Sequence, residues 1–353
     1  MPHATTERSR PGPCRRRLPP STREPAPTPR RYHRLPRGRR PARPQHRSNS
    51  PGEAWPNPQA AGFTERTDRD AHSPPRPDPC APGLRDAHAL LLAGDPRAAA
   101  DRCARSRARA ARAGVSGRQA AFGALRAEAL LCLGELAEAE QQAEAAARAT
   151  TPATFPGRWP TAALAEVLTE TGRHDEAGRH LHRAAPEPST RTADLPRYLR
   201  ARGRHRLAVN RPRAALADFL RAGELARTGL FARLPWRIDA AEALLHLGRP
   251  HDAASLLDQQ LTTPAGLGPR HRGTALRLRA ATEEAARRPA TLARAADALR
   301  AAGDRPELAR ALADLGTTLH TLGDTSAAQA LLRRTHHLAT TCGAGTPTAH
   351  PLW

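Results

Sequence analysis

The 353-residue chain contains no lysine, one isoleucine and one methionine, so arginine supplies all 56 basic side chains. The lack of lysine excludes the phosphate-binding loop G-x-x-x-x-G-K-[ST], which needs that residue. This bias is typical of a GC-rich genome, so the net charge of +22 is weak evidence for a nucleic-acid partner. Aromatic residues make up only 3% of the chain, too few for a platform on which single-stranded bases stack.

The five cysteines are odd in number and form no C-x-x-C pair. This pattern argues against a disulfide scaffold or a zinc ribbon and indicates a reducing compartment. Apolar runs such as residues 87–93 are too short to span a bilayer, and no apolar signal-peptide core follows Met1. We therefore expect a cytoplasmic protein that does not span a membrane.

Motifs that carry chemistry are missing as well. No nucleophile elbow of the form G-x-S-x-G occurs. His180 and His182 are two residues apart, so they point to different faces of a helix, and His336 and His337 also diverge. His174 lies in the same predicted hairpin as His180 and His182. These three histidines are more readily explained as solvated side chains than as a metal site. The sequence predicts no enzyme, no catalytic, cofactor-binding or metal-binding residue and no cofactor, and it identifies no partner-binding residue.

Residues 1–83 differ in composition from the rest of the chain. They hold 19 of the 35 prolines, and their arginines outnumber their acidic residues more than twofold. Without an apolar period, such a segment buries too little surface to offset its chain entropy, so we predict a disordered arm. The arm is either a basic contact for nucleic acid or an acidic partner, or a solvated extension without function. Residues 343–353 also lack a helical period and are predicted to be a loose tail.

The segment 304–343 predicts two helices joined by one turn. Five leucines recur at steps of four and three residues, which places them on one face of a helix: Leu308, Leu312, Leu315, Leu319 and Leu322. Asp304 and Glu307 have the spacing of a capping box, and Gly323 is suited to end the helix in a left-handed conformation. Asp324 caps the next helix, whose predicted apolar face consists of Ala328, Leu331, Leu332 and Leu338.

This turn recurs along the chain with a period of about 38 residues. The turn residues are Gly94, Gly134, Gly172, Asn210, Gly248 and Gly323, and the last interval, 75 residues, predicts one further turn near residue 286. Five positions after each turn stands an alanine, namely Ala99, Ala139, Ala177, Ala215, Ala253 and Ala328. Nine positions after it stands a residue predicted to fill the groove between helices, namely Cys103, Ala143, Leu181, Phe219, Leu257 and Leu332.

A small residue after a turn allows close approach of two helices, and repeated hairpins with bare apolar faces stack on one another. The sequence therefore predicts an all-α fold, an α-solenoid of about seven helical hairpins over residues 84–342. The predicted helix pairs are 84–93 with 96–113, 118–133 with 136–149, 161–171 with 174–185, 197–209 with 212–226, 237–247 with 252–261, 272–286 with 291–301, and the pair within 304–343. Residues 150–160 and 186–196 are predicted loops.

The segments 133–139, 171–177, 247–253 and 322–328 resemble the inter-helix turn of the tetratricopeptide family. The period here is longer than that family's usual 34 residues. Residues 298–316 and 331–344 further resemble the helical-repeat region of large ATP-binding regulators of the LuxR family. In that family the region connects an ATPase to a DNA-binding helix-turn-helix, neither of which the chain contains. The chain is thus either a shortened regulator or a stand-alone regulator that acts through a partner.

Two functions are compatible with these observations. The favoured one is a non-catalytic scaffold or sensor associated with transcription regulation, which binds a protein or peptide along the solenoid. The alternative is an arginine-rich protein that binds nucleic acid weakly and without sequence specificity, mainly through the basic arm. An arginine stripe on one face would favour the alternative. The arginines near the turns and on outer faces look scattered instead: Arg173, Arg179, Arg211, Arg221, Arg249 and Arg333.

Overall fold

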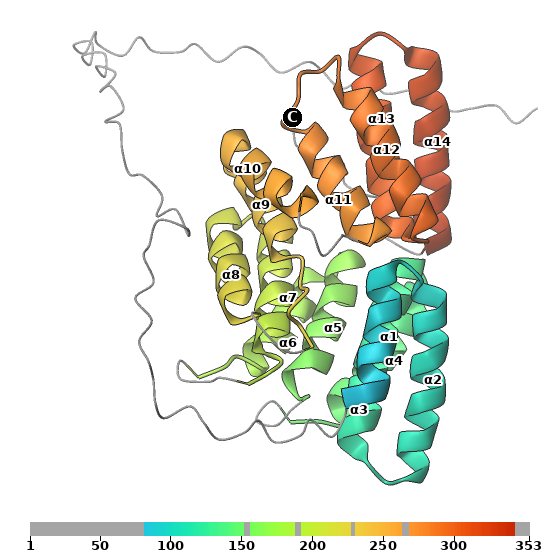
Figure 1. Cartoon of the computed structure of the whole chain (residues 1–353), viewed down its shortest axis with the longest axis vertical. Coiled ribbons are helices and arrows are strands. Elements are labelled where there is room, and N and C mark those ends of the chain that lie inside the picture. Colours follow the sequence, from blue (N-terminus) through green and yellow to red (C-terminus); the bar gives the residue numbers. More distant parts are fainter. Residues whose placement is uncertain (1–80, 152–155, 188–191, 227–229, 263–267, 343–353) are drawn as a thin grey trace, which may run out of the picture. The chain divides into compact units, whose positions relative to one another are not determined.

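Fourteen α-helices and no strand make up the residues described in the computed structural model, which are 81–151, 156–187, 192–226, 230–262 and 268–342 (Figure 1). In chain order they form seven hairpins: α1 (Ala81–Ala93) with α2 (Pro96–Arg112), α3 (Ser116–Leu133) with α4 (Leu136–Arg148), α5 (Arg158–Glu170) with α6 (His174–Arg183), α7 (Leu195–Ala208) with α8 (Pro212–Leu225), α9 (Trp236–His246) with α10 (Pro250–Leu261), α11 (Pro269–Ala280) with α12 (Arg288–Ala301), and α13 (Arg305–Thr321) with α14 (Thr325–Cys342). The predicted all-α solenoid of about seven hairpins is confirmed. The predicted tail and all but the last three residues of the predicted arm lie outside the described residues.

Helix boundaries depart from the prediction at a few places. α1 begins at Ala81, three residues before the predicted start of the repeats. α5 begins inside the predicted loop 150–160, and α7 begins inside the predicted loop 186–196. Both helices contain a proline within their first turn, where its missing N–H has no helical partner to lose. α11 ends at Ala280 rather than near residue 286, and residues 281–287 form the turn that lacks a glycine.

The six predicted turn residues all adopt the left-handed conformation, with φ from 56° at Asn210 to 92° at Gly323. The alanines five positions later are all buried, at no more than 1% exposure. Of the six residues at the ninth position, the first five are buried as predicted, but Leu332 is 44% exposed. The prediction for Leu332 is wrong because α14 is the last described helix, so no further described hairpin covers that face.

Aspartates cap three helices through bonds to backbone N–H groups three residues later: Asp95, Asp304 and Asp324. The second half of the predicted capping box at α13 is wrong. The backbone N–H of Asp304 donates to the carbonyl of Leu299 rather than to the Glu307 side chain. That carboxylate instead accepts a hydrogen bond from Arg310 at 2.6 Å. Glu307 thus forms an ion pair with Arg310 in place of the predicted cap. This ion pair directs the Glu307 side chain toward the neighbouring helices.

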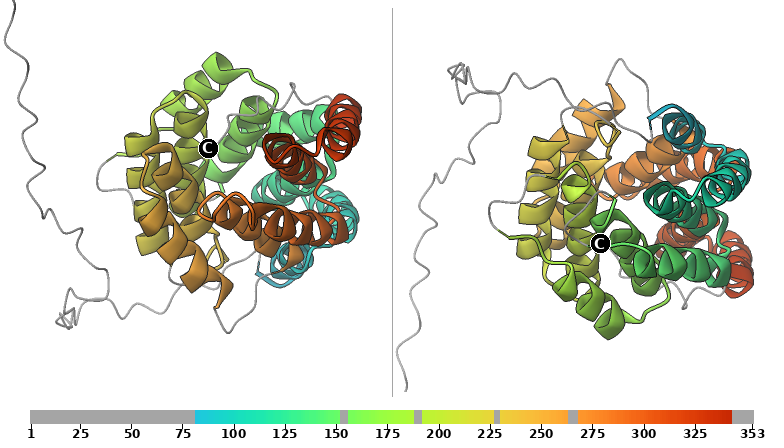
Figure 2. Two further views of the ribbon diagram at one scale, coloured as in Figure 1. Left: turned by 90° about the horizontal axis from the view of Figure 1, so that it is seen from above. Right: turned by 90° about the horizontal axis from the view of Figure 1, so that it is seen from below.

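The last hairpins of the array return to the first ones, as Figure 2 shows from above and below. α11 contacts α1, and α13 contacts α3. A Cβ atom on Gly134 would collide with the Cys342 side chain, and one on Gly94 would collide with Pro269. These turn glycines therefore satisfy two requirements, a positive φ and a close approach of helices from the far end of the repeats.

Candidate functional site

A polar residue stands six positions before each of the six predicted turns, on the first helix of its hairpin. These residues are His88, Glu128, Glu166, Arg204, Glu242 and Thr317. Four of these residues, Glu128, Glu166, Arg204 and Glu242, pair with charged groups of neighbouring hairpins. These four belong to a network of ion pairs that is largely buried.

The network begins at Arg197 of α7, which lies between two carboxylates. Its Nη2 is 2.6 Å from Oε1 of Glu128 in α3 and 3.0 Å from Oε2 of Glu166 in α5. Trp159 donates from Nε1 to the same Glu128 oxygen at 2.5 Å. All four side chains are at most 10% exposed. Three successive hairpins are thus joined through fully desolvated, charge-assisted contacts.

The network continues through α7 into α9. Arg200 forms a two-pronged pair with Asp239, with Nε 2.6 Å from Oδ2 and Nη2 3.1 Å from Oδ1. Its Nη1 also lies 3.0 Å from Glu166, so that this carboxylate is shared between two arginines. Arg204 adds a contact of 3.0 Å to Asp239 and one of 3.6 Å to Glu242. Cations and anions alternate along this path, which reduces the repulsion between like charges.

The C-terminal hairpins complete the network. Arg277 of α11 lies 3.4 Å from Glu242 and 3.3 Å from Glu307. Arg310 of α13 lies 2.6 Å from Glu307 and 2.5 Å from Glu170 in α5. We call this connected set the charged seam, and its members are Glu128, Glu166, Glu170, Arg197, Arg200, Arg204, Asp239, Glu242, Arg277, Glu307, Arg310 and Asp314.

The surroundings of the seam lower the pKa of one of its carboxyl groups and raise the pKa of another. Burial alone would raise the pKa of Glu307, but the nearby Arg277 and Arg310 outweigh burial and hold that pKa below its usual value. At Glu128 burial prevails over Arg197, and the pKa is raised. The charges are thus balanced by partners within the fold, and each arginine of the seam already has its acceptors.

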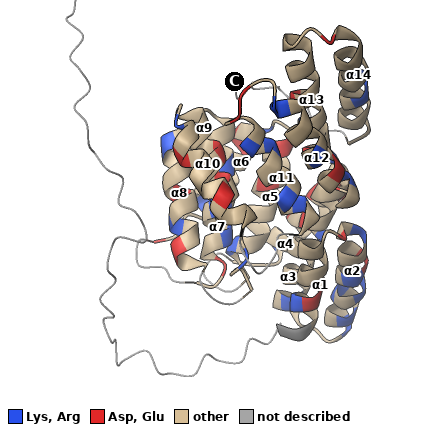
Figure 3. Ribbon diagram, turned by 45° about the horizontal axis from the view of Figure 1, so that its top comes forward, with Lys and Arg blue, Asp and Glu red and all other residues tan. Residues whose placement is uncertain are grey.

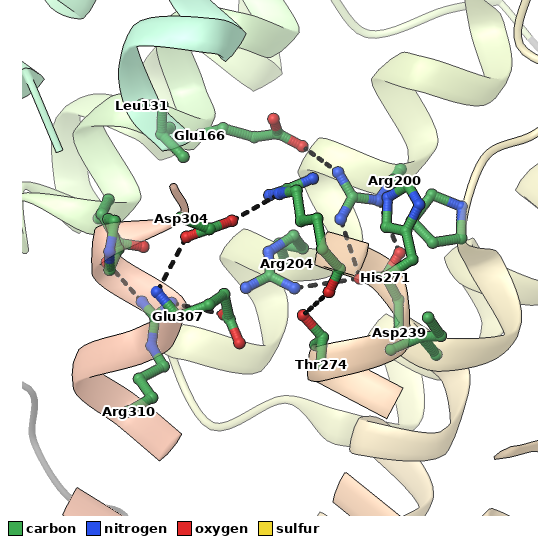
Figure 4. Close-up of a pocket in the computed structure, with 15 residues that line it drawn as sticks. Leu131, Glu166, Arg200, Arg204, Asp239, His271, Thr274, Asp304, Glu307 and Arg310 are labelled. Carbon is green, nitrogen blue, oxygen red and sulfur yellow. Dashed lines mark hydrogen bonds and ion pairs between the residues drawn. The ribbon is translucent and has the colours of Figure 1, made fainter. Parts of the chain in front are cut away.

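Two small cavities, of about 50 and 40 Å³, lie beside the seam. Figure 4 shows the larger one, with Arg200, Arg204 and Asp239 on one side and Asp304 and Glu307 on the other. Each cavity has room for a few water molecules but not for a peptide. A peptide therefore does not fit into the space beside the seam.

A groove of about 540 Å³ lies on the outside of the array, between α6 and the end of α7. We call it the basic groove, and its lining residues are His174, Asp175, Gly178, Arg179, His182, Arg183, His205, Val209 and Arg211. Arg179, Arg183 and Arg211 are exposed, and none of their guanidinium groups forms an ion pair or a hydrogen bond with a described residue. In the seam, each arginine is paired with a carboxylate, whereas these three arginines of the groove are not paired with any described one.

The histidines predicted to be solvated divide between the groove and the open surface. The rings of His174 and His205 are 6.4 Å apart, and the Nδ1 atom of each is buried without a hydrogen bond to a described residue. His182 lines the groove and His180 does not, in accord with their predicted divergence. His336 and His337 are exposed on α14. Over the described part of the chain, no three His, Cys, Asp or Glu side chains are arranged to hold a metal ion.

Three segments of the chain match the tetratricopeptide repeat: residues 158–183, 235–259 and 309–334. They fall on the hairpins α5–α6, α9–α10 and α13–α14. The predicted resemblance to this repeat is thereby confirmed, and the chain carries a type of hairpin that commonly mediates protein–protein interaction and is typically non-catalytic. Comparison with curated proteins gives no match. Among the described helices, none has the length and apolar character needed to cross a bilayer.

Proposed function

We propose that the protein is a non-catalytic helical-repeat scaffold or sensor of transcription regulation, which binds a protein partner. The proposal rests on the three tetratricopeptide segments, because hairpins of this class commonly bind other proteins. Stacked helical hairpins offer extended surfaces whose side chains vary while the backbone stays the same. In the regular array here, seven such hairpins supply that surface.

In this proposal the partner binds outside the charged seam. A segment that entered the seam would have to displace buried pairs such as Arg200 with Asp239, and breaking a buried pair leaves an uncompensated charge. The cavities there have volumes of only about 50 and 40 Å³. The outer face instead offers a groove about tenfold larger, at α6 and α7.

The connection to transcription rests on the resemblance of residues 298–316 and 331–344 to the repeat region of LuxR-family regulators. The described part of these segments belongs to α12, α13 and α14. No residue matches the ATP-binding or DNA-binding motifs of that family. We therefore expect the protein to act through a partner in the cytoplasm, with neither ATP hydrolysis nor sequence-specific DNA binding of its own.

Partner capture followed by reconstitution tests this function. The full-length protein is immobilised, proteins retained from a lysate are identified, and the best candidate is purified and titrated by calorimetry. A saturable complex with defined stoichiometry is expected, and the purified protein alone is expected to hydrolyse no ATP. ATP turnover by the pure protein, or the failure of every purified candidate to bind, would contradict the proposal.

A second candidate function, non-specific nucleic-acid binding, is favoured by one feature of α2. Arg105, Arg109 and Arg112 follow one another at steps of four and three residues, so they lie on one exposed face. None of the three forms an ion pair with a described residue. Basic residues also occur on many other helices, as Figure 3 shows, and this spread favours the scaffold.

Salt dependence separates the two functions. Binding of a DNA duplex to the full chain is expected to be weak and to fall steeply as salt increases, because it comes from counterion release. It should be lost on removal of residues 1–83, which carry about half of the net charge of +22. If the shortened protein still bound a defined DNA sequence at physiological salt, the scaffold function would be wrong and the helical arginines would be the site.

A further inference from the structure

The sequence of α6 divides its surface into a packed face and a charged face. Ala177 and Leu181 are 0% and 3% exposed and pack inward, four residues apart. Arg179 and Arg183 have the same spacing on a different face, and both are exposed. Because side chains four residues apart on a helix lie one above the other, the two guanidinium groups are neighbours along the basic groove.

The other wall of the groove comes from α7 and from the residue that precedes α8. Arg211 is exposed at the N-terminal cap of α8, and His205 lies on the last turns of α7. Gly178 lies on the α6 wall, and a Cβ atom there would lie 3.3 Å from Nε2 of His205 on the other wall. This distance is tighter than an ordinary side-chain contact, so α6 and α7 approach closely at this point, and an elongated ligand would lie over that contact, along the open face of the groove.

The arginines of the groove differ from their neighbours in how they are paired. Arg173, one turn away, lies 2.5 Å from Glu140 and 2.5 Å from Glu176. In the lining of the groove, by contrast, Asp175 is the one acidic residue beside three arginines, which leaves a net charge of +2 with neutral histidines. The fold thus leaves an excess of cations over anions at a concave surface, and a ligand that supplies carboxylates complements it.

We propose that the basic groove is a docking site for an acidic peptide segment of the partner, an inference that rests on the scaffold function above. Residues 174–183 cover about 14 Å at the helical rise of ~1.5 Å per residue. An extended peptide rises about 3.3 Å per residue, so roughly four residues fill the groove. Carboxylates on such a segment match the forked guanidinium donors of Arg179 and Arg183.

A fluorescein-labelled hexaglutamate peptide is the probe, with hexaserine and hexalysine peptides for comparison, and fluorescence anisotropy is the measurement. The full-length protein is compared with two double variants of equal charge change. The variant Arg179→Glu with Arg183→Glu reverses the charge of two arginines in the groove. The variant Arg333→Glu with Arg334→Glu reverses the charge of two exposed arginines on α14. A third variant, Gly178→Leu, fills the groove without changing its charge. Thermal unfolding of each variant confirms that the helices remain folded.

Hexaglutamate is expected to bind the wild-type protein in preference to both comparison peptides. The groove variant is expected to bind hexaglutamate at least about tenfold more weakly, since two positive charges that attract the peptide are replaced by negative charges that repel it. Gly178→Leu should also weaken binding, whereas the α14 variant should change it less than about twofold. Equal loss in the two double variants would show that net charge alone attracts the peptide, and unchanged binding by Gly178→Leu would show that the groove is not the site.

Two further outcomes separate this inference from its premises. If the groove variant retains the partner found by capture but no longer binds hexaglutamate, the scaffold function stands and the groove is not where the partner docks. If the groove variant loses affinity for a single-stranded oligonucleotide and not for hexaglutamate, the groove is a nucleic-acid site and the inference is wrong. Loss of both the partner and the peptide in the groove variant alone supports the proposal.

Discussion

Arg310 of α13 donates a hydrogen bond from Nη2 to Oε1 of Glu170 in α5 at 2.5 Å, across 140 positions of sequence. Its Nη1 pairs with Glu307 one turn earlier on the same helix. Arg310 thus connects the seventh hairpin directly to the third. Stability in a repeat array comes mainly from contacts between adjacent repeats, so this pair adds a long-range constraint to the fold.

Replacement of Arg310 by methionine tests this constraint. Glu170 and Glu307 would lose a cation while remaining largely buried, at 15% and 8% side-chain exposure. Since the Arg310 side chain is 29% exposed, we expect a loss of about 1 to 3 kcal/mol in unfolding free energy, between the values for surface and buried pairs. Urea denaturation followed by circular dichroism gives this number.

Arg300→Met is the matched control for that variant. Arg300 pairs with Asp297 on the surface of α12, where the two side chains are 47% and 72% exposed. We expect a change within about 0.5 kcal/mol, the usual value for an exposed pair. Equal losses for Arg310→Met and Arg300→Met would mean that the connection between the third and seventh hairpins contributes no stability.

Two turn glycines with the same backbone conformation should differ in their tolerance of alanine. Gly134 and Gly172 have φ of 73° and 79°, so each substitution costs about 1 kcal/mol for the left-handed conformation. Only at Gly134 would the new Cβ also collide with the Cys342 side chain, whereas Gly172 has open space. We expect Gly134→Ala to cost about 1 to 3 kcal/mol more in chemical denaturation. Partial recovery by Cys342→Ala would identify the contact, and equal costs would contradict it.

The alanine five residues after each turn should tolerate no enlargement. Ala215 in α8 is 0% exposed, and Ala217 in the same helix is exposed. Leucine at position 215 is expected to cost about 1 to 3 kcal/mol through overpacking, and leucine at position 217 less than about 0.5 kcal/mol. Melting temperatures of the two variants measure the difference. Similar melting temperatures would show that the repeat offset does not mark the helix–helix contact.

The period of the turns was predictable because each turn imposes a local requirement. A left-handed residue must be glycine or asparagine, and the close approach that follows requires a small side chain. The charged seam was not predicted, because most of its partners lie far apart in the sequence, up to 140 positions for Arg310 and Glu170. A signal was nevertheless present, since Glu128, Glu166, Arg204 and Glu242 recur every 38 residues among alanines and leucines.

The closure of the array and the basic groove have no comparable local signal. Contact of Gly134 with Cys342 depends on the small rotation added by every intervening hairpin. Arg179 and Arg211 were predicted to be exposed near turns, and the structure confirms that. Their meeting across one groove depends on how α6 packs on α7, which neither segment specifies by itself.

Two histidines beside the seam, His271 which is buried and His88 which is half-buried, couple the stability of the fold to pH. Burial, and then the charge of Arg270, lowers the pKa of His271 to about 3. Burial, and then the charge of Arg197, lowers the pKa of His88 to about 4. In the unfolded chain both imidazoles would titrate near 6.5. The unfolded state therefore binds more protons between pH 6.5 and 4, and stability decreases as the pH falls through that range.

His271→Leu should flatten this dependence. Each histidine that stays neutral in the folded state contributes up to about 1.4 kcal/mol per pH unit below its unfolded pKa. Between pH 6 and 5, the unfolding free energy of the variant is thus expected to depend on pH less steeply than that of the wild-type protein, by about 1 kcal/mol per pH unit. This difference is expected whatever the stability of the variant at pH 7. Urea denaturation repeated across the pH range measures it. The carboxyl groups of the seam are common to both proteins and cancel in the difference. Parallel curves for His271→Leu and the wild-type protein would show that His271 is protonated in the fold.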